Sequence, residues 1–202
     1  MYKYIKAICH VFKNYRLYVI QILIYEIIYY FKFNNAFNKF KYLNSNFLSD
    51  SIPCPYFFLI KIKKFIGKKN FSYLCDLGSG YGKILYFFGK LNRYKIDGVE
   101  LEKEIYLEST KLNDNKINIF NENILTFNIK KKKYDLLIIN DPLKKNKDLI
   151  QLILKIKKKY KNIYFVFINL NQKKLNFIRN NLKVIKSFVI SNSRNVLFCS
   201  VN

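Results

Sequence analysis

The residues best placed to do chemistry lie together in one short segment, residues 71–83. An apolar run ends there at Asp76, and Gly78, Gly80 and Gly82 follow at alternate positions before an apolar, helical sequence begins. Because glycine has no Cβ, such a turn can adopt positive φ and let a ligand approach the backbone, while the helix N-terminus presents N–H groups. The pattern predicts a strand, a tight turn and a helix that together bind a nucleoside-like cofactor.

The spacing of these glycines argues against two common phosphate-binding motifs. The dinucleotide fingerprint needs a third glycine three residues after the second, and Lys83 stands at that position. A phosphate-cradling loop needs Ser or Thr after Gly-Lys, but Ile84 follows Gly82 and Lys83. What remains is an acidic residue followed by Gly-x-Gly-x-Gly.

This remaining motif resembles that of the class I S-adenosylmethionine-dependent methyltransferases. In that family the glycine turn packs against the methionine part of S-adenosylmethionine, and the acidic residue lies beside it. The cofactor-binding residues that the resemblance implies here are Asp76, Gly78, Ser79, Gly80 and Gly82.

A second predicted strand, residues 94–100, ends in a carboxylate. Glu100 lies 22 residues after Gly78, and in a doubly wound sheet this position faces the ribose of a bound nucleotide. A carboxylate there accepts hydrogen bonds from both ribose hydroxyls, and Leu101 follows beside it. The alternative is a solvated residue at a strand end, but the glycine turn at the expected distance upstream favours cofactor binding by Glu100 and Leu101.

The loop after the third predicted strand, residues 117–120, extends the resemblance to the adenine. The family usually carries an aspartate there, and Asn123 occupies the matching place. An amide can still pair with the adenine amino group because it offers both an acceptor and a donor. Glu122 is the alternative cofactor-binding residue in this loop.

The loop after the fourth predicted strand, residues 134–139, carries the candidate catalytic residues Asn140, Asp141 and Pro142. The resemblance implies that this loop contacts the acceptor and the transferring methyl group, with Asn140 also touching the cofactor. Members that methylate amino groups of nucleobases or glutamine continue with a second proline and an aromatic residue, whereas Leu143 follows here. This difference from the family pattern weakens the prediction that the methyl acceptor is a nucleobase. Ordinary turn chemistry after a strand is the alternative explanation for the loop.

Helices and strands continue to alternate to the end of the chain, which predicts an α/β fold. Two final strands, residues 184–190 and 196–201, are joined by a connection too short for a crossover helix, so they must be antiparallel neighbours. The family resemblance implies a Rossmann-like, seven-stranded, mostly parallel sheet with a C-terminal antiparallel hairpin. We therefore predict a methyltransferase domain at residues 51–202 and an N-terminal helical extension at residues 1–50.

The extension contains a strongly apolar run, Leu17 to Phe31, that is too short to span a membrane. Its fifteen residues would rise ~22 Å as a helix against a hydrocarbon core of ~30 Å, and Gln21 and Glu26 interrupt it. The two alternatives are a helix packed over the catalytic domain and a basic amphipathic helix on an anionic bilayer. Tyr56 follows the extension, and similar methyltransferases place a Tyr/Pro-rich segment there that closes over the cofactor, which makes Tyr56 a candidate cofactor-binding residue. A plain linker with a helix start is the alternative interpretation of Tyr56.

Composition bounds the remaining possibilities. The four cysteines are scattered without paired spacing, and His10 is the only histidine, so we predict reduced cysteines, a cytoplasmic protein and no metal site. The net charge of +24 permits nucleic-acid binding, but Lys, Asn, Ile, Phe and Tyr are over-used together, as an AT-rich genome would produce. Peripheral contact with the inner face of a membrane through the N-terminal helix is a further option.

Three functions follow from the sequence. The favoured one is an S-adenosylmethionine-dependent methyltransferase that acts on a protein amine of the lysine type, or on a small or lipid-like molecule. The second is a methyltransferase of RNA or DNA, which only the charge favours. The third is an S-adenosylmethionine-binding module without activity.

Overall fold

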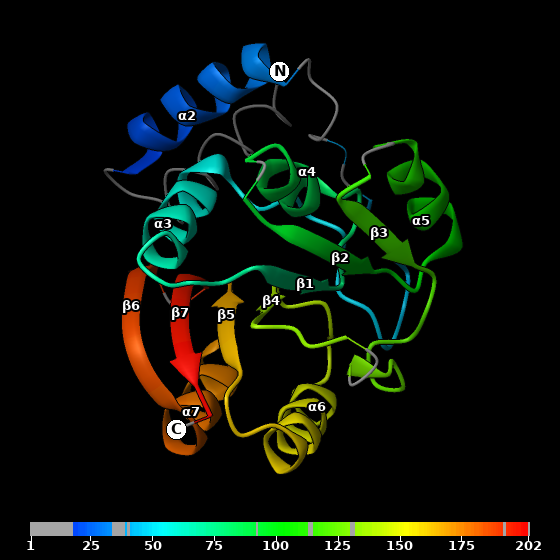
Figure 1. Ribbon diagram of the computed structural model, residues 1–202, viewed down its shortest axis with the longest axis vertical. Helices are drawn as coiled ribbons and strands as arrows, with labels where there is room; N and C mark the ends of the chain where they lie inside the picture. The colour runs from blue at the N-terminus through cyan, green and yellow to red at the C-terminus, as the bar shows by residue number, and fades with distance from the viewer. Residues whose placement is uncertain are drawn as a thin grey trace.

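The computed structural model describes residues 18–33, 39, 41–91, 93–112, 115–129, 132–191 and 193–201. Its centre is a seven-stranded sheet in the order β3-β2-β1-β4-β5-β7-β6 (Figure 1). The strands are β1 (Tyr73–Leu77), β2 (Lys95–Val99), β3 (Ile117–Phe120), β4 (Leu136–Ile139), β5 (Tyr164–Ile168), β6 (Lys183–Ser191) and β7 (Arg194–Ser200). Strands β1 to β5 pair in parallel, whereas β7 runs antiparallel to both β5 and β6.

This topology confirms the predicted α/β fold with a mostly parallel sheet and a C-terminal antiparallel hairpin. The second strand of the hairpin, β7, takes the inner place beside β5, and β6 forms the edge of the sheet. Burial explains this order, because nearly every residue of β7 is buried, while most residues of β6 are exposed or half-buried. A strand covered on both faces belongs inside a sheet.

Helices cover both faces of the sheet (Figure 1). On one face lie α2 (Val19–Lys32), α3 (Tyr56–Ile66) and α4 (Lys83–Gly89), and on the other lie α6 (Asn146–Lys159) and α7 (Gln172–Asn181). A short helix, α5 (Lys103–Ser109), and a 3₁₀ turn, η2 (Thr110–Leu112), connect β2 to β3. The sequence analysis did not predict α5, whose seven residues bury only Ile105 and Ser109.

Alternation of side chains along the strands divides the core in two. Leu74 of β1 and Ile138 of β4 pack with α3 and α4, whereas Leu77 and Ile139 pack with α6 and α7. Because every second residue of a strand points to the same face, each central strand contributes to both clusters. This two-sided burial holds the ends of β1, β2 and β4, where the predicted site residues lie.

The N-terminal part of the chain packs on this domain. Helix α2 lies against α3, with Tyr29 stacked on Tyr56 at a ring-centroid distance of 4.8 Å. Lys41 and Ser51 exchange two backbone hydrogen bonds of 3.1 and 2.9 Å across the predicted domain boundary at residue 50, which stays a prediction. Cys9 and His10 lie outside the described residues. No helix in the described part combines the length and hydrophobicity that a transmembrane span needs.

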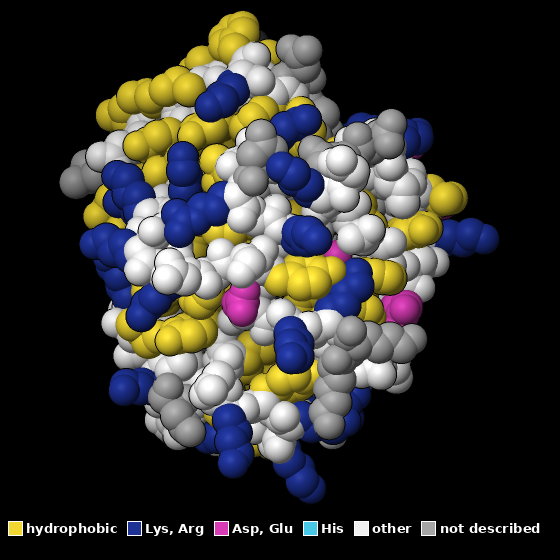
Figure 2. All heavy atoms as spheres, viewed as in Figure 1, with side chains coloured by type: hydrophobic (Ala, Val, Ile, Leu, Met, Phe, Trp, Pro, Cys, Tyr) yellow, Lys and Arg dark blue, Asp and Glu magenta, His cyan; other side chains and the backbone are white. Residues whose placement is uncertain are grey.

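Basic side chains dominate the surface. Figure 2 shows Lys and Arg spread over the visible face, with few acidic side chains among them. A row of hydrophobic side chains occupies the top of the same view, at the position of α2 in Figure 1.

Candidate functional site

The glycine turn after β1 has the backbone conformation that its sequence predicts. Gly78, Gly80 and Gly82 have φ values of +87°, +55° and +85°. A Cβ on Gly78 would lie 2.3 Å from the Cβ of Pro142, so the turn meets the loop after β4 at a distance that only glycine allows. The N–H of Gly78 donates to the carbonyl of Val99 (2.9 Å), which ties the turn to the end of β2.

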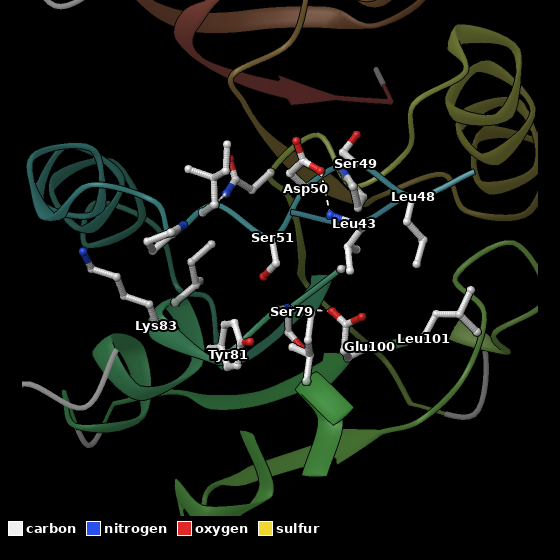
Figure 3. Close-up of a pocket in the computed structure, with 18 of the residues that line it drawn as sticks. Leu43, Leu48, Ser49, Asp50, Ser51, Ser79, Tyr81, Lys83, Glu100 and Leu101 are labelled. Atoms are coloured by element: carbon white, nitrogen blue, oxygen red, sulfur yellow. Dashed lines mark hydrogen bonds between the residues drawn. The ribbon is translucent and has the colours of Figure 1, made fainter. Parts of the chain in front are cut away.

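A crevice lies between this turn and a covering segment, which we define as residues 41–54. In Figure 3 the Ser51 side chain points across the cavity toward the side where Ser79 and Tyr81 lie, and Glu100 stands beside them. The covering segment is held by the loop after β4, because the Ser49 N–H donates to the Pro142 carbonyl (3.0 Å). Its apolar side chains line the cavity together with others from helix α5 and the loops after β2 and β3: Leu43, Phe47, Leu48, Leu101, Ile105 and Ile124.

The structure brings most, but not all, of the predicted site residues to this crevice. The predicted residues that line it are Gly78, Ser79, Gly80, Glu100, Leu101, Asn123, Asn140 and Pro142. The predicted residues that do not line it are Tyr56, Asp76, Gly82, Glu122 and Asp141. The roles of all thirteen stay predictions.

Glu100 is fixed in place by backbone groups. Its Oε2 accepts the N–H of Gly80 and its Oε1 accepts the N–H of Glu102, both at 2.8 Å. Burial raises the pKa of this carboxyl, and the backbone N–H groups oppose the rise. A carboxylate offers about four lone-pair sites, so Glu100 keeps the capacity to accept at least one further hydrogen bond beside its backbone donors. Glu100 thus presents an oriented acceptor to the crevice.

Asp76 is fully buried at the end of β1, and neither carboxylate oxygen has a hydrogen-bond partner among the described residues. Burial raises its pKa well above the usual range, and the nearby charge of Glu100 adds to the rise. Asp76 also lies near enough to Cys54 to raise the pKa of its thiol. Cys54 and Glu100 both line the crevice. Asp76 therefore lies near two residues that line the crevice, but it does not line the crevice itself.

The two candidate adenine-binding residues in the loop after β3, Asn123 and Glu122, have different surroundings. Asn123 lines the crevice, and its Oδ1 accepts the N–H of Leu125 (2.9 Å), which fixes the side chain. Glu122 is exposed to solvent and lies outside the crevice lining. Of the two residues, Asn123 is the one that lines the crevice.

Tyr56 supports the crevice from behind. Its N–H donates to Oε1 of Glu26 on α2 (2.6 Å), and the Nζ of Lys83 lies 3.9 Å from the centre of its ring. Lys83, which follows the glycine turn, also pairs with Oε2 of Glu26 (2.8 Å). These contacts join α2, α3 and α4 at one side of the crevice.

The loop after β4 is held from both sides. The Nδ2 of Asn140 donates to the carbonyl of Ile52 (3.3 Å), and its Oδ1 accepts from the Nδ2 of Asn169 at the end of β5 (3.0 Å). Asn140 therefore links the covering segment to the sheet.

Asp141 adopts a positive φ of 41° and pairs with Lys174 of α7, whose side chain is almost completely buried. The Nζ of Lys174 also donates to the carbonyl of Leu143 (2.5 Å). Burial raises the pKa of Asp141, and the positive charge of Lys174 opposes the rise. Lys174 thus anchors the loop that carries the candidate catalytic residues.

A second hollow adjoins the crevice on the far side of Asn140. The residues that line it are Ser49, Asp50, Ile52, Asn140, Asp141, Lys144, Asn169 and Arg194. Ser49, Asp50, Ile52 and Asn140 line both cavities, so the contact between Asn140 and Ile52 stands between them. The arrangement can hold a cofactor in one cavity and a second molecule in the other.

Sequence reasoning expected a segment next to Tyr56 to close over the cofactor, but it did not give the bounds of the covering segment, and it missed the buried lysine. Lys174 lies beside Leu175 and Ile178 on the apolar side of α7, and this position was its only signal. The chain has 37 Lys and Arg residues, so one lysine next to an apolar stripe does not stand out. Among the described residues, no three His, Cys, Asp or Glu side chains converge as metal ligands.

Comparison with protein-family models finds no match, and comparison with curated proteins finds none either. Solved structures do match. The magnesium protoporphyrin IX methyltransferase of Synechocystis PCC 6803, solved with bound S-adenosylmethionine, aligns with a TM-score of 0.57 and 12% identity over 71% of this chain and 76% of its own.

Two further structures give similar values. The methyltransferase domain of a bacterial Hen1 protein has a TM-score of 0.58 and 12% identity over 70% of this chain and 96% of its own. A Streptococcus pneumoniae protein, provisionally assigned as a tRNA methyltransferase, has a TM-score of 0.57 and 13% identity over 70% and 68%. At these identities the likeness establishes the class I methyltransferase fold.

Proposed function

We propose that this protein is an S-adenosylmethionine-dependent methyltransferase. The observation that carries the proposal is that the glycine turn and Glu100 line one crevice, which adjoins a second hollow at Asn140. The fold, shared with a methyltransferase solved with bound S-adenosylmethionine, supports the same conclusion.

The residues of the crevice fit this cofactor. Glu100 would accept hydrogen bonds from the ribose hydroxyls, because its carboxylate is oriented and keeps acceptor capacity. Asp76, buried without a partner in the described part of the chain, suits the cationic amino group of the methionine portion. Leu101, Ile105 and Ile124 would pack on the adenine, with Asn123 at its edge.

When bound, S-adenosylmethionine supplies an electrophilic methyl group on its sulfonium sulfur. The protein's part is to orient an acceptor lone pair in line with that methyl group, and proximity and alignment provide most of the acceleration. Asn140 stands between the two cavities and would align the acceptor. Asp141 would accept a proton that the acceptor releases.

We propose an amine acceptor, of the protein-lysine or small-molecule type. The second hollow is lined by the oxygen-bearing side chains of Asp50, Asp141 and Asn169, beside the cations Lys144 and Arg194. The Oδ1 of Asn169 is buried without a hydrogen-bond partner among the described residues. Such groups match the N–H groups of an amine. The neighbours' names cover acceptors as different as a porphyrin and a tRNA, so they do not choose among classes.

The direct test incubates the purified protein with methyl-radiolabelled S-adenosylmethionine and separated cell protein, small molecules, lipid and RNA. We expect label in the protein or small-molecule fraction. Label in none of the fractions, together with tight cofactor binding, would mean a binding module without activity.

The site assignment is tested by calorimetry of S-adenosylmethionine binding. Glu100→Ala should weaken binding about tenfold or more, because two ribose hydrogen bonds to a charged acceptor are lost. Glu122→Ala, on the neighbouring loop, is the matched control and should bind as the wild type does. Asp141→Ala should keep cofactor affinity and lower turnover. Unchanged affinity in Glu100→Ala would show that the cofactor site is wrongly placed.

A nucleic-acid methyltransferase is the second candidate, favoured by the net charge of +24. Lysine-rich surfaces bind polyanions with a steep dependence on salt. Labelled RNA or DNA, with binding that falls sharply as salt rises, would favour this candidate over an amine acceptor.

A further inference from the structure

The outward face of α2 is a continuous apolar stripe. Its large side chains recur at helical spacing of three and four residues, and each is half or more exposed: Ile20, Leu23, Ile24, Ile27, Ile28 and Phe31. Figure 2 shows hydrophobic side chains along the top of the molecule at this position. A contiguous row of this size on a surface indicates an interaction site.

The opposite side of α2 already provides its contacts with the domain. Val19 and Ile22 are buried, and Tyr25 packs against Phe57 of α3. Glu26, the only acidic residue in the helix, points inward to Lys83. The fold therefore uses one face of the helix and leaves an uncharged apolar face outside, which is the pattern of a helix that packs on two sides.

The charge around this stripe indicates what covers it. In residues 18–33, which the structure describes, the single acidic residue is Glu26, and its side chain already pairs with Lys83. Lys32 ends α2, and Lys61 lies 5.1 Å from the ring of Phe57 beside its first turn. In Figure 2, basic side chains border the hydrophobic row and the few acidic ones lie farther away. An apolar stripe bordered by cations complements an anionic lipid surface.

We propose that α2 docks the protein on an anionic membrane surface, with its axis in the plane of the interface. The fourteen residues of α2 span ~21 Å, against ~30 Å for the hydrocarbon core, so the helix lies on the bilayer and does not cross it. A second copy of this chain is a poorer occupant, because two molecules of charge +24 repel each other. The proposal does not depend on the proposed function.

The test measures cosedimentation of the full chain with vesicles of phosphatidylcholine alone or mixed with phosphatidylglycerol. We expect binding to the mixed vesicles, weakened by added salt, and little binding to the neutral ones. Leu23→Glu should reduce binding to the mixed vesicles about tenfold or more, because a charge replaces an apolar group in the interface.

Leu107→Glu is the matched control, since Leu23 and Leu107 are both 52% exposed and Leu107 lies on α5. Its affinity for the mixed vesicles should stay within about twofold of the wild-type affinity, because the apolar face of α2 is unchanged. Circular dichroism checks that both variants are folded.

Three results would overturn the proposal. The first is equal binding to neutral and mixed vesicles, or none to either, as expected if residues 1–17 covered the stripe. The second is an equal loss in the two variants. The third is a wild-type dimer in sedimentation that Leu23→Glu converts to monomer, which would assign the stripe to a second copy.

Discussion

Two aspartates on neighbouring strands are both fully buried but have opposite surroundings. Asp97 of β2 has four donors: the hydroxyls of Tyr73 (2.8 Å) and Tyr134 (2.5 Å), the Nζ of Lys132 (2.8 Å) and the Nδ2 of Asn118 (3.0 Å). Asp76 of β1 has no donor in the described part of the chain.

The difference separates a structural carboxylate from one that can serve a ligand. Burying a charge costs little only when hydrogen bonds and an opposite charge compensate it, as at Asp97. Asp76 lacks both, and burial raises its pKa well above the usual range. Under the proposed function, the amino group of S-adenosylmethionine would supply the positive charge that Asp76 lacks.

The largest expected effect follows from removing the charge of Asp97. Asp97→Asn should lower the free energy of unfolding by about 3–5 kcal/mol, because Lys132 and two tyrosine hydroxyls lose a charged acceptor in the interior. Urea denaturation measures the change. The same substitution at Asp76 is the matched comparison and should not destabilise the protein at neutral pH. Equal losses at both positions would remove the distinction between the two aspartates.

A smaller effect should follow from deleting one donor to Asp97. Tyr134→Phe removes a hydrogen bond to a charged group and should cost about 1.5–3 kcal/mol in urea denaturation. Tyr160→Phe is the matched control, because the Tyr160 hydroxyl is buried without a partner among the described residues, so its removal should be neutral or stabilising. A loss in the control as large as in Tyr134→Phe would show that removal of a buried hydroxyl by itself, and not the lost hydrogen bond to Asp97, sets the cost.

The smallest expected effect, taken per pH unit, concerns Asp76. Its folded-state pKa lies above the ordinary value of 3.8, so above about pH 4 the unfolded chain has released the proton and the folded chain still holds it. Stability from this group is therefore lost as pH rises toward the folded pKa, by up to ~1.4 kcal/mol per pH unit. The Asp76→Asn variant has no proton to release at this position. Its free energy of unfolding should therefore rise relative to that of the wild type by up to ~1.4 kcal/mol for each pH unit.

Urea denaturation of both proteins at several pH values above about pH 4 measures this difference. All other titrating groups are common to the two chains, so the difference isolates Asp76. A difference that stays constant with pH would mean that Asp76 is ionised in the folded protein and has a partner. Asp76→Asn should also bind S-adenosylmethionine more weakly, which separates a ligand-binding role from a purely destabilising one.

Local pattern was sufficient to predict the strands, but not the partners of particular side chains. The run ending at Asp76 and the run ending near Glu100 each predict a buried strand, and both are confirmed. No local sequence pattern near Asp97 predicts its hydrogen-bond donors. These donors lie 21 to 37 positions away in the chain and come together only when the strands of the sheet align. The same holds for Lys174, which reaches Asp141 from another helix.

The sequence by itself determined the fold class, the glycine turn and the spacing from that turn to Glu100, because these features depend on residues close in the chain and on the period of burial. Tertiary structure alone decided which residues cover the crevice, 41–54, that Asn123 and not Glu122 lines it, and that α2 keeps an apolar face outside. The physical reason is that burial and charge pairing depend on which segments come together in space, and long-range packing sets this, not local order along the chain.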